Sequence, residues 1–406
     1  MYQDTRAIYS LGNIDTDWVH SQRGVRQGCV LSPLLFAIYT EELAIRIRKS
    51  GYGIRVGSEK LGCLLYADDI VIMSEDSEEL QEMLDLTAQY GRDFDMSFSS
   101  VKSQVVVVNA DGEDDGRAWR IGEMEIGRTD QYKYLGIMVD ENGTDRTKLD
   151  RIAKANQWVG RLGSVARCRA NRYEVVRGVW KGMAVPGLMY GLECMRWTAK
   201  DLDKLEVVQN RVARLALGAN RYVAVEALRG EAGWSTFDER IGKAVLQYKV
   251  RLGKMDEDRW ARRVYEWACR GSKWEKASNQ WEKKCGMQGF TRSEMMVVNS
   301  EKEIKRKVKD KIQEKGLQKW SQGVGGKSSL EWYQGKARPK SEAFYDGSLG
   351  SILLFKARTK SLEVNSRVYR WANEGSKECR MCTWGVDETI VHVLIECPCY
   401  GGRDGK

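Results

Sequence analysis

The chain has 406 residues, of which 42% are hydrophobic and 30% charged, and its formal net charge is +9. This length suffices for two or three domains with a sizeable core, and no apolar run is long enough to cross a bilayer. The first residues lack the basic and apolar stretches of a secretion signal, so we expect a protein that acts in the nucleus, the cytoplasm or both. The excess of positive charge favours a polyanionic partner such as a nucleic acid.

The first predicted element is a glycine-containing loop at residues 23–33 that leads into a helix. Ser32 is the expected N-cap and Pro33 the expected first helical residue. Apolar residues at helical spacing predict a buried stripe, namely Leu34, Leu35, Ile38, Tyr39 and Leu43. The helix N-terminus then points at the loop, where its free amides favour phosphate and Gln27 can hydrogen-bond a nucleotide or template base. A purely structural loop is the alternative.

Residues 64–72 predict a tight hairpin, because two adjacent acids, Asp68 and Asp69, lie between apolar flanks rich in β-branched residues. We expect both strands to be buried. Buried like charges repel and lose hydration unless they share a cation, so the pair predicts a metal site. Oxygen ligands at a hairpin tip suit Mg²⁺, or Mn²⁺ in its place, completed by water and substrate phosphates. The alternative is an ordinary surface turn.

Helix and strand signals alternate after this hairpin. Asp76 and Glu79 form a capping-box pattern that opens a helix ending at Gly91. Residues 104–108 predict a buried strand, and residues 132–139 predict another. Lys102, just before the first of these strands, is either a solvated lysine or a proton donor with a lowered pKa.

The pattern becomes helical from residue 144 to residue 255, with an excess of Lys and Arg that predicts one cationic face. Tryptophans then recur every seven residues, at Trp260, Trp267, Trp274 and Trp281, and Gly271 is expected to break the helix between them. Core packing is the favoured reading of this stripe, and stacking on unpaired bases is the alternative. A mixed-charge helix follows and runs into a Gly-rich linker at residues 323–326.

Four residues near the C-terminus have the order and spacing of a Cys₂-His-Cys zinc site. They are Cys379, Cys382, His392 and Cys397. Zn²⁺ prefers four such ligands in a tetrahedron, and the two-residue gap between the first pair allows a tight turn to present both sulfurs to one ion. Cys399 is an alternative fourth ligand, and redox-active thiols are the alternative to a zinc site.

Four segments of the N-terminal region carry a resemblance to a known family. They are the loop at 23–33, the Tyr-Ala-Asp-Asp string at 66–69, Phe-Ser-Ser-Val-Lys-Ser at 98–103 and Tyr-Lys-Tyr-Leu-Gly at 132–136. In this order they resemble the later motifs of the reverse transcriptase palm of non-LTR (LINE-type) retrotransposons. Segments at 186–193, 203–210, 226–234 and 367–400 resemble the regions that follow this palm.

The resemblance implies an α+β fold with four parts. These are a partial palm, an antiparallel sheet with helices, at 1–142; a helical thumb and connector at 143–255; a basic, Trp-rich helical segment and linker at 256–345; and a zinc-knuckle module at 346–406. It also implies an RNA-directed DNA polymerase whose partners are an RNA template, a DNA primer or target DNA, and dNTPs. The C-terminal module would grip nucleic acid.

The same resemblance assigns roles to individual palm residues. Asp68 and Asp69 would bind Mg²⁺, and Lys102 would protonate the leaving pyrophosphate. The expected nucleotide and template contacts are Arg26, Gln27, Gly28 and Tyr66. The expected primer contacts are Tyr134, Leu135 and Gly136.

One catalytic feature of the family is missing. A two-metal polymerase needs a further carboxylate from a neighbouring strand, and none of the acids before Gln27 lies in an apolar strand context. We therefore expect an N-terminally truncated reverse transcriptase, inactive by itself. The alternative is a non-catalytic nucleic-acid-binding protein derived from a retrotransposon.

Overall fold

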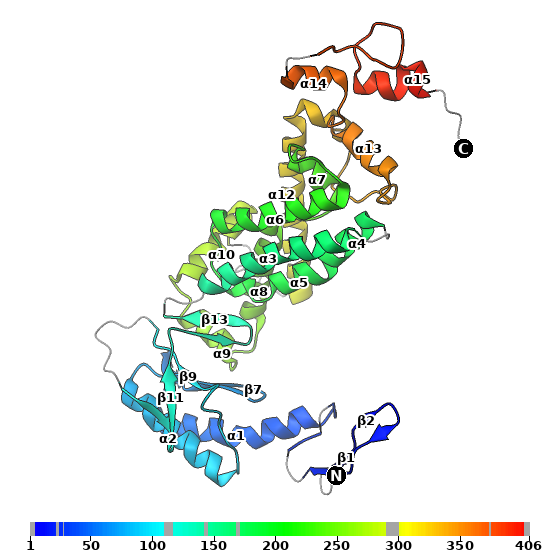
Figure 1. Ribbon diagram of the computed structural model, residues 1–406. Helices are drawn as coiled ribbons and strands as arrows, with labels where there is room; N and C mark the ends of the chain where they lie inside the picture. The colour runs from blue at the N-terminus through cyan, green and yellow to red at the C-terminus, as the bar shows by residue number, and fades with distance from the viewer. Residues whose placement is uncertain are drawn as a thin grey trace. The chain divides into compact units, whose positions relative to one another are not determined.

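The computed structural model describes residues 5–21, 24–26, 28–108, 117–141, 145–167, 171–289, 300–372 and 375–401. The chain divides into two compact units, the first comprising Met1–Gly143 with Asp256–Arg270 and the second Thr144–Met255 with Gly271–Lys406 (Figure 1). The mixture of helices and strands confirms the α+β class. Throughout these described ranges, no helix combines the length and apolarity needed to cross a membrane.

The first unit contains short strands that pair as separate ribbons. The strands are β1 (Thr5–Ala7), β2 (Ser10–Leu11), β3 (Ile14–Asp15), β4 (Val19–Ser21), β5 (Ile54–Val56), β6 (Glu59–Leu61), β7 (Cys63–Tyr66), β8 (Asp69–Ile72), β9 (Gln104–Val105), β10 (Trp119–Ile121), β11 (Met124–Arg128), β12 (Gln131–Tyr134) and β13 (Ile137–Asp140). Within the described residues they form antiparallel pairs and one three-stranded sheet, β10-β11-β9, in which β9 and β11 are parallel. The antiparallel sheet expected from the sequence is thus divided, and the strand expected at 104–108 is limited to β9.

The first long helix of this unit, α1 (Ser32–Ser50), begins and ends close to its sequence signals. Pro33 lies in its first turn, and Gly51 ends it in the left-handed conformation, with φ of 73°. The expected N-cap was wrong by one residue, because Leu31 occupies that position and Ser32 is already helical. The Ser32 hydroxyl instead donates a hydrogen bond to the Arg26 carbonyl oxygen at 2.5 Å, which fixes the preceding loop against the helix.

The apolar stripe of α1 is only partly buried. Leu43 and Ile47 are in the core, whereas Leu34 and Ile38 are 60% and 58% exposed. The prediction of a buried stripe along the whole helix was therefore wrong for its first two turns. The buried half packs with Met83 and Tyr90 of α2 (Ser77–Asp93) under the β7–β8 hairpin, whose Cys63, Ile70 and Ile72 lie against this cluster.

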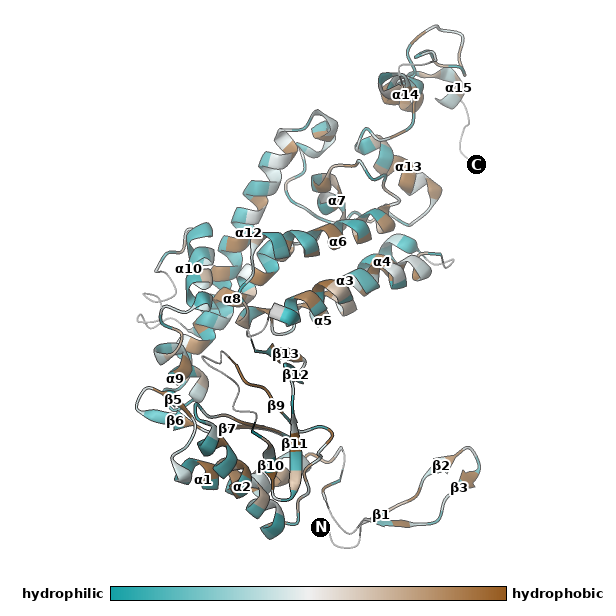
Figure 2. Ribbon diagram, turned by 60° about the vertical axis from the view of Figure 1, so that its left-hand side comes forward, coloured by the Kyte–Doolittle hydropathy of each residue, from teal (hydrophilic) through white to brown (hydrophobic). Residues whose placement is uncertain are grey.

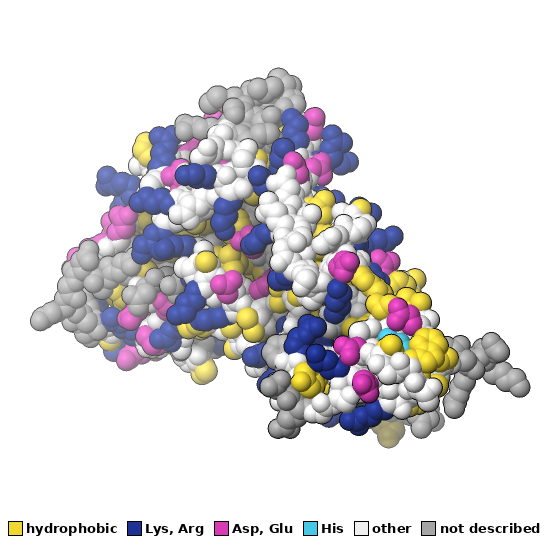
Figure 3. Space-filling model, turned by 90° about the horizontal axis from the view of Figure 1, so that it is seen from above, with side chains coloured by type: hydrophobic (Ala, Val, Ile, Leu, Met, Phe, Trp, Pro, Cys, Tyr) yellow, Lys and Arg dark blue, Asp and Glu magenta, His cyan; other side chains and the backbone are white. Residues whose placement is uncertain are grey.

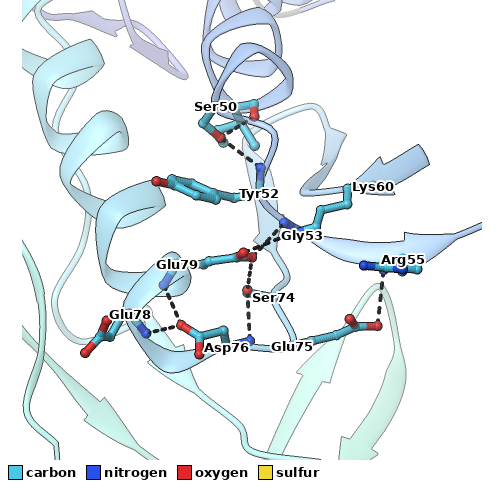
Figure 4. Close-up of polar contacts among 11 residues, drawn as sticks. Ser50, Tyr52, Gly53, Arg55, Lys60, Ser74, Glu75, Asp76, Glu78 and Glu79 are labelled. Carbon is cyan, nitrogen blue, oxygen red and sulfur yellow. Dashed lines mark hydrogen bonds and ion pairs between the residues drawn. The ribbon is translucent and has the colours of Figure 1, made fainter. Parts of the chain in front are cut away.

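A polar network ties the start of α2 to the β5–β6 ribbon (Figure 4). Asp76 is the N-cap, and its carboxylate accepts hydrogen bonds from the amides of Glu78 and Glu79 at 2.8 and 2.9 Å. The Glu79 side chain does not complete the expected capping box. It accepts hydrogen bonds from Lys60 at 2.8 Å and from Ser74 at 3.2 Å instead, because the ribbon brings a cation within its reach.

The second unit is helical. Its elements are α3 (Asp145–Val165), α4 (Arg172–Val179), the π-helical η1 (Trp180–Ala184), α5 (Val185–Met189), η2 (Leu192–Cys194), α6 (Ala199–Leu217), α7 (Val225–Ala232), α8 (Phe237–Lys254), α10 (Lys273–Lys284), α12 (Glu301–Gly325), η3 (Ser328–Tyr333), α13 (Leu349–Arg358), α14 (Asn365–Ala372), η4 (His392–Glu396) and α15 (Pro398–Gly401). Helices such as α6 and α8 carry separate polar and apolar faces (Figure 2). The apolar faces enclose a core that includes Trp180, Leu205 and Phe237, all fully buried.

The Gly-rich segment expected as a linker is helical. Gly323 and Gly325 lie in the last turn of α12. A side chain at Gly323 would place its first carbon 2.9 Å from the Glu226 carboxylate, so glycine here permits close packing against α7. Composition alone could not distinguish this packing role from chain flexibility.

The tryptophan stripe is split between the two units. Trp260 and Trp267 lie on α9 (Trp260–Trp267) of the first unit, and Trp281 lies on α10 of the second. Gly271, with φ of 76°, separates the helices as the sequence predicted. Trp281 is buried against Gly242, whereas Trp267 is 66% exposed, so the expected core packing holds for only part of the stripe.

Candidate active-site and metal-binding residues

The β7–β8 hairpin presents the two adjacent acids at its tip. Tyr66 pairs with Asp69 in the antiparallel register, which leaves Ala67 and Asp68 as a two-residue turn. Ala67 has φ of 52°, as the first position of a tight hairpin turn requires. The alternation of side chains directs Ile70 toward the core, and Asp69 and Tyr66 share the opposite face.

The prediction that both strands of this hairpin are buried was wrong. Asp68 and Asp69 are exposed, and Tyr66 is 64% exposed. Exposed carboxylates retain much of their hydration, so the pair does not require a cation to compensate for burial. A metal ion at this tip would therefore need further ligands or charges close to the two acids.

Strand β12 contacts the Lys102 turn and lies within electrostatic range of the hairpin tip. The hydroxyl of Tyr132 donates a hydrogen bond to the Lys102 carbonyl oxygen at 2.9 Å. Burial raises the pKa of Tyr134, and the negative charge of Asp69 raises it further, which places this phenol in the electrostatic range of the acids. Strand β12 thus holds the Lys102 backbone through Tyr132 and places Tyr134 within electrostatic range of Asp69.

The segment expected as one strand over residues 132–139 is a hairpin. Strands β12 and β13 pair with Tyr134 opposite Ile137, and Leu135 and Gly136 form the turn with φ of 45° and 79°. The prediction was wrong because it treated Gly136 as a strand residue, although Leu-Gly between two apolar runs is also compatible with a tight turn. The three expected primer contacts consequently lie at the tip of a second hairpin.

The loop before α1 contains three of the expected nucleotide and template contacts. Gln27 lies outside the described residues. Arg26 is exposed, and Gly28 has φ of 81°. Among the described residues, no hydrogen bond or ion pair joins Arg26 to Asp68 or Asp69. Lys102 is also exposed, so only its backbone is held in place.

Four metal-ligand side chains meet in the C-terminal part of the second unit. Cys379, Cys382, His392 and Cys397 present ligand atoms that all lie within 4.8 Å of one another. The sulfurs of Cys379 and Cys397 are 3.9 Å apart, and Cys382 Sγ lies 3.4 Å from His392 Nε2. Tetrahedral Zn²⁺ separates its sulfur and nitrogen ligands by roughly 3.5–3.8 Å, so these side chains fit this ion.

Local backbone hydrogen bonds assemble the cluster. Glu378 and Asp387 form an isolated antiparallel bridge, which folds the Cys379–Cys382 turn back on itself. The Cys379 amide donates a hydrogen bond to the Val386 carbonyl oxygen at 2.9 Å. Helix η4 then returns the chain, and the Cys397 amide donates a hydrogen bond to the His392 carbonyl oxygen at 2.7 Å.

The structure separates the two candidates for the fourth ligand. Cys397 is 2% exposed and lies in the cluster, whereas Cys399 is exposed and lies outside it. Burial raises the pKa of Cys397, but hydrogen bonds from the amides of Cys399 and Tyr400 and from the side chains of Cys379 and Cys382 together hold it below the ordinary value. A stabilised thiolate is the form that binds metal.

Sequence reasoning missed the residues that support this cluster. Nδ1 of His392 is buried without a hydrogen-bond partner among the described residues, and the nearest carboxylate oxygen belongs to Glu396, at 3.7 Å. Glu388, 9% exposed, accepts a hydrogen bond from the Asn365 amide at 3.0 Å and so ties α14 to the cluster. The four-residue spacing of His392 and Glu396 in a helical segment was an available signal.

Comparisons with known proteins agree with the N-terminal motifs. Residues 4–139 match the family described as reverse transcriptase (RNA-dependent DNA polymerase). The chain is 28% identical over 159 residues to the Pol polyprotein of the type-1 retrotransposable element R2 from Nasonia vitripennis, which covers 37% of this chain and 15% of the relative. It is 26% identical over 247 residues to the RNA-directed DNA polymerase from mobile element jockey of Drosophila funebris, with 57% and 26% covered.

A third relative shows the same partial coverage. It is the Pol polyprotein of the type-2 retrotransposable element R2DM from Drosophila melanogaster, 31% identical over 149 residues, which is 33% of this chain and 14% of the relative. The aligned parts therefore span about a quarter or less of the length of these relatives.

Proposed function

Because residues 4–139 carry a reverse transcriptase domain of the non-LTR retrotransposon kind, we propose that this chain is part of an RNA-directed DNA polymerase. Its partners are then an RNA template, a DNA primer or target DNA, and dNTPs, and its place is the nucleus, the cytoplasm or both. The observation that carries the proposal is the match of residues 4–139 to the reverse transcriptase family, a stretch that contains the Asp68–Asp69 hairpin tip and strand β12.

In the proposed site, Asp68 and Asp69 bind Mg²⁺, or Mn²⁺ in its place, and the ion supplies charge neutralisation for the triphosphate. Arg26, Gln27, Gly28 and Tyr66 contact the nucleotide and the template. Tyr134, Leu135 and Gly136 hold the primer end. Lys102 donates a proton to the departing pyrophosphate once substrate has covered its exposed ammonium group.

We further propose that this chain does not extend a primer by itself. Within the described residues, no third Asp, Glu, Cys or His joins Asp68 and Asp69 in a metal-ligand group. Two divalent ions that hold both the primer hydroxyl and the triphosphate need additional anionic ligands.

A primer-extension assay with the purified chain, Mg²⁺, dNTPs and a primed RNA template tests this proposal. We expect no extended product. Robust extension that disappears in Asp69→Asn would show that the two acids suffice and would overturn the proposed inactivity.

The zinc cluster supports a second function, nucleic-acid binding without catalysis. Exposed side chains surround the cluster, including Met381, Trp384 and Ile395, which are 53%, 57% and 75% exposed. Figure 3, which views the molecule from above, shows a gathering of hydrophobic side chains with Lys and Arg side chains nearby. Aromatic and apolar groups next to cations suit contact with unpaired bases.

Binding of a labelled single-stranded RNA distinguishes the two functions. Under the second function, binding persists in Asp68→Ala and collapses in Cys382→Ser, because only the latter removes a zinc ligand. Equal binding by wild-type protein and Cys382→Ser would exclude the zinc module as the binding element.

A further inference from the structure

A cavity of about 450 Å³ lies in the second unit, between the start of α6 and one face of α10. Its walls come from two stretches of chain, residues 196–202 and residues 273–284. Sites for small molecules and nucleotides commonly have volumes of about 300–1,000 Å³, so one nucleotide unit fits here. No role in the polymerase or zinc site is assigned to this cavity.

The charged residues that line the cavity are all basic. Its basic lining residues are Arg196, Lys273, Lys276 and Lys284, and no Asp or Glu lines it. Lys284 is paired with Asp238 at 3.2 Å. Within the described part of the chain, the side chains of Arg196, Lys273 and Lys276 make no ion pair. A concave surface lined by one sign of charge concentrates ions of the opposite sign, so the cavity attracts anions.

The floor of the cavity is apolar and held in place. Trp197 and Trp281 are each 7% exposed. The indole N–H of Trp197 donates a hydrogen bond to the Leu192 carbonyl oxygen at 3.1 Å, and Trp281 packs closely on Gly242. A preformed floor costs little ordering free energy when a ligand binds.

We propose that this cavity binds one nucleotide unit of a single-stranded nucleic acid, with phosphate at Arg196, Lys273 and Lys276 and the base or sugar over the tryptophan floor. The inference rests on the proposed function, which supplies the nucleic acid. A single strand fits better than a duplex, because an unpaired base is free to enter a recess whereas a paired base is not.

The test compares two matched double variants by fluorescence anisotropy with labelled single-stranded RNA, single-stranded DNA and duplex DNA. The pocket variant is Lys273→Gln with Lys276→Gln. The control is Lys181→Gln with Lys283→Gln, which removes the same charge from exposed residues outside the cavity; Lys283 lies on the same helix. Circular dichroism checks that both variants fold.

We expect the pocket variant to bind single strands about tenfold more weakly than the wild type. The negative slope of log K against log salt concentration should become shallower by about 1.4, because two phosphate contacts are lost. The control should bind like the wild type. Cross-linking of a 4-thiouridine oligonucleotide should map to residues 196–202 or to α10 in the wild type.

The possible results separate this inference from the function on which it rests. If the wild type binds none of the three probes, the proposed nucleic-acid function fails. If the wild type binds and both double variants bind equally well, only the cavity assignment fails. A duplex that binds as tightly as the single strands and loses as much in the pocket variant would overturn the single-strand assignment.

Discussion

At the scale of single residues, Glu231 shows how an ion cluster holds the second unit together. Its side chain is fully buried, and it pairs with Lys336 at 3.0 Å and with Arg358 at 3.2 Å. Burial and the charge of Glu231 raise the pKa of both Tyr333 and Tyr345, which lie beside it. Helix α7 is thereby joined to the segment that follows η3 and to α13 by charges that are largely buried.

We expect Glu231→Gln to lower the free energy of unfolding by about 3 kcal/mol, because it leaves the largely buried Arg358 guanidinium without this partner, although Lys336 keeps its pair with Glu342 at 2.6 Å. Urea unfolding followed by circular dichroism measures the change. Glu331→Gln is the matched control, since its pair with Lys360 at 2.8 Å is at the surface and should leave stability unchanged. Equal effects of the two changes would contradict the role assigned to Glu231.

Glu396 is the residue we expect to orient His392 in the zinc site. Carboxylates that contact the second nitrogen of a metal-binding histidine fix its ring and raise its basicity, so Glu396→Gln should weaken Zn²⁺ binding by about 10–100-fold. Competition with a chromophoric chelator measures this affinity. Glu378→Gln serves as control, since its exposed side chain is outside the cluster. An unchanged Zn²⁺ affinity in Glu396→Gln would show that the 3.7 Å separation is not closed on metal binding.

At the scale of elements, the cap of α2 makes a pH-dependent prediction. Hydrogen bonds from the amides of Glu79 and Glu78 lower the pKa of Asp76 below its ordinary value of 3.8. A carboxyl with a lowered folded-state pKa stabilises the fold at pH above its ordinary value, and this contribution is lost as the pH falls through the lowered pKa. The cap therefore acts at neutral pH and fails in acid.

We expect Asp76→Ala to increase hydrogen exchange of the α2 amides at neutral pH and to have a smaller effect in strong acid, because the contribution of the charged cap is lost as the pH falls through its lowered pKa. Each comparison is made with the wild type at the same pH. Asp85→Ala, an exposed change inside the helix, is the control. An effect of equal size at both pH values would exclude the carboxylate charge as the source of stability.

Hairpins show what sequence could predict at this scale. The β7–β8 hairpin was predicted with its acids at the tip, because the apolar flanks and the turn residues agree. The exposure of its outer face was not predicted, since Leu64 and Val71 have the same local character as the inward residues. The β12–β13 hairpin was missed because a single glycine in an apolar run is equally typical of a strand.

At the scale of the whole molecule, the chain returns to its first unit after forming much of the second. Helix α9 packs on the β5–β6 ribbon, where Trp267 lies against Gly57 and Arg263 forms an ion pair with Glu59. The sequence predicted consecutive segments and did not predict that residues 256–270 belong to the first unit. The tryptophans spaced seven residues apart therefore lie in both units. Their regular spacing does not indicate where one unit ends and the other begins.

The sequence by itself determined the similarity of residues 4–139 to reverse transcriptases, the order of the turn and metal-ligand motifs, and the four Cys and His residues that gather at one point. Those features are local, because short spacings and turn residues control them. Only the tertiary structure decided that Asp68 and Asp69 are exposed, that Cys397 rather than Cys399 joins the cluster, and that basic residues of α10 and of the loop before α6 line a partly apolar cavity. These features depend on contacts between residues far apart in the chain, which burial and packing select and local pattern does not encode.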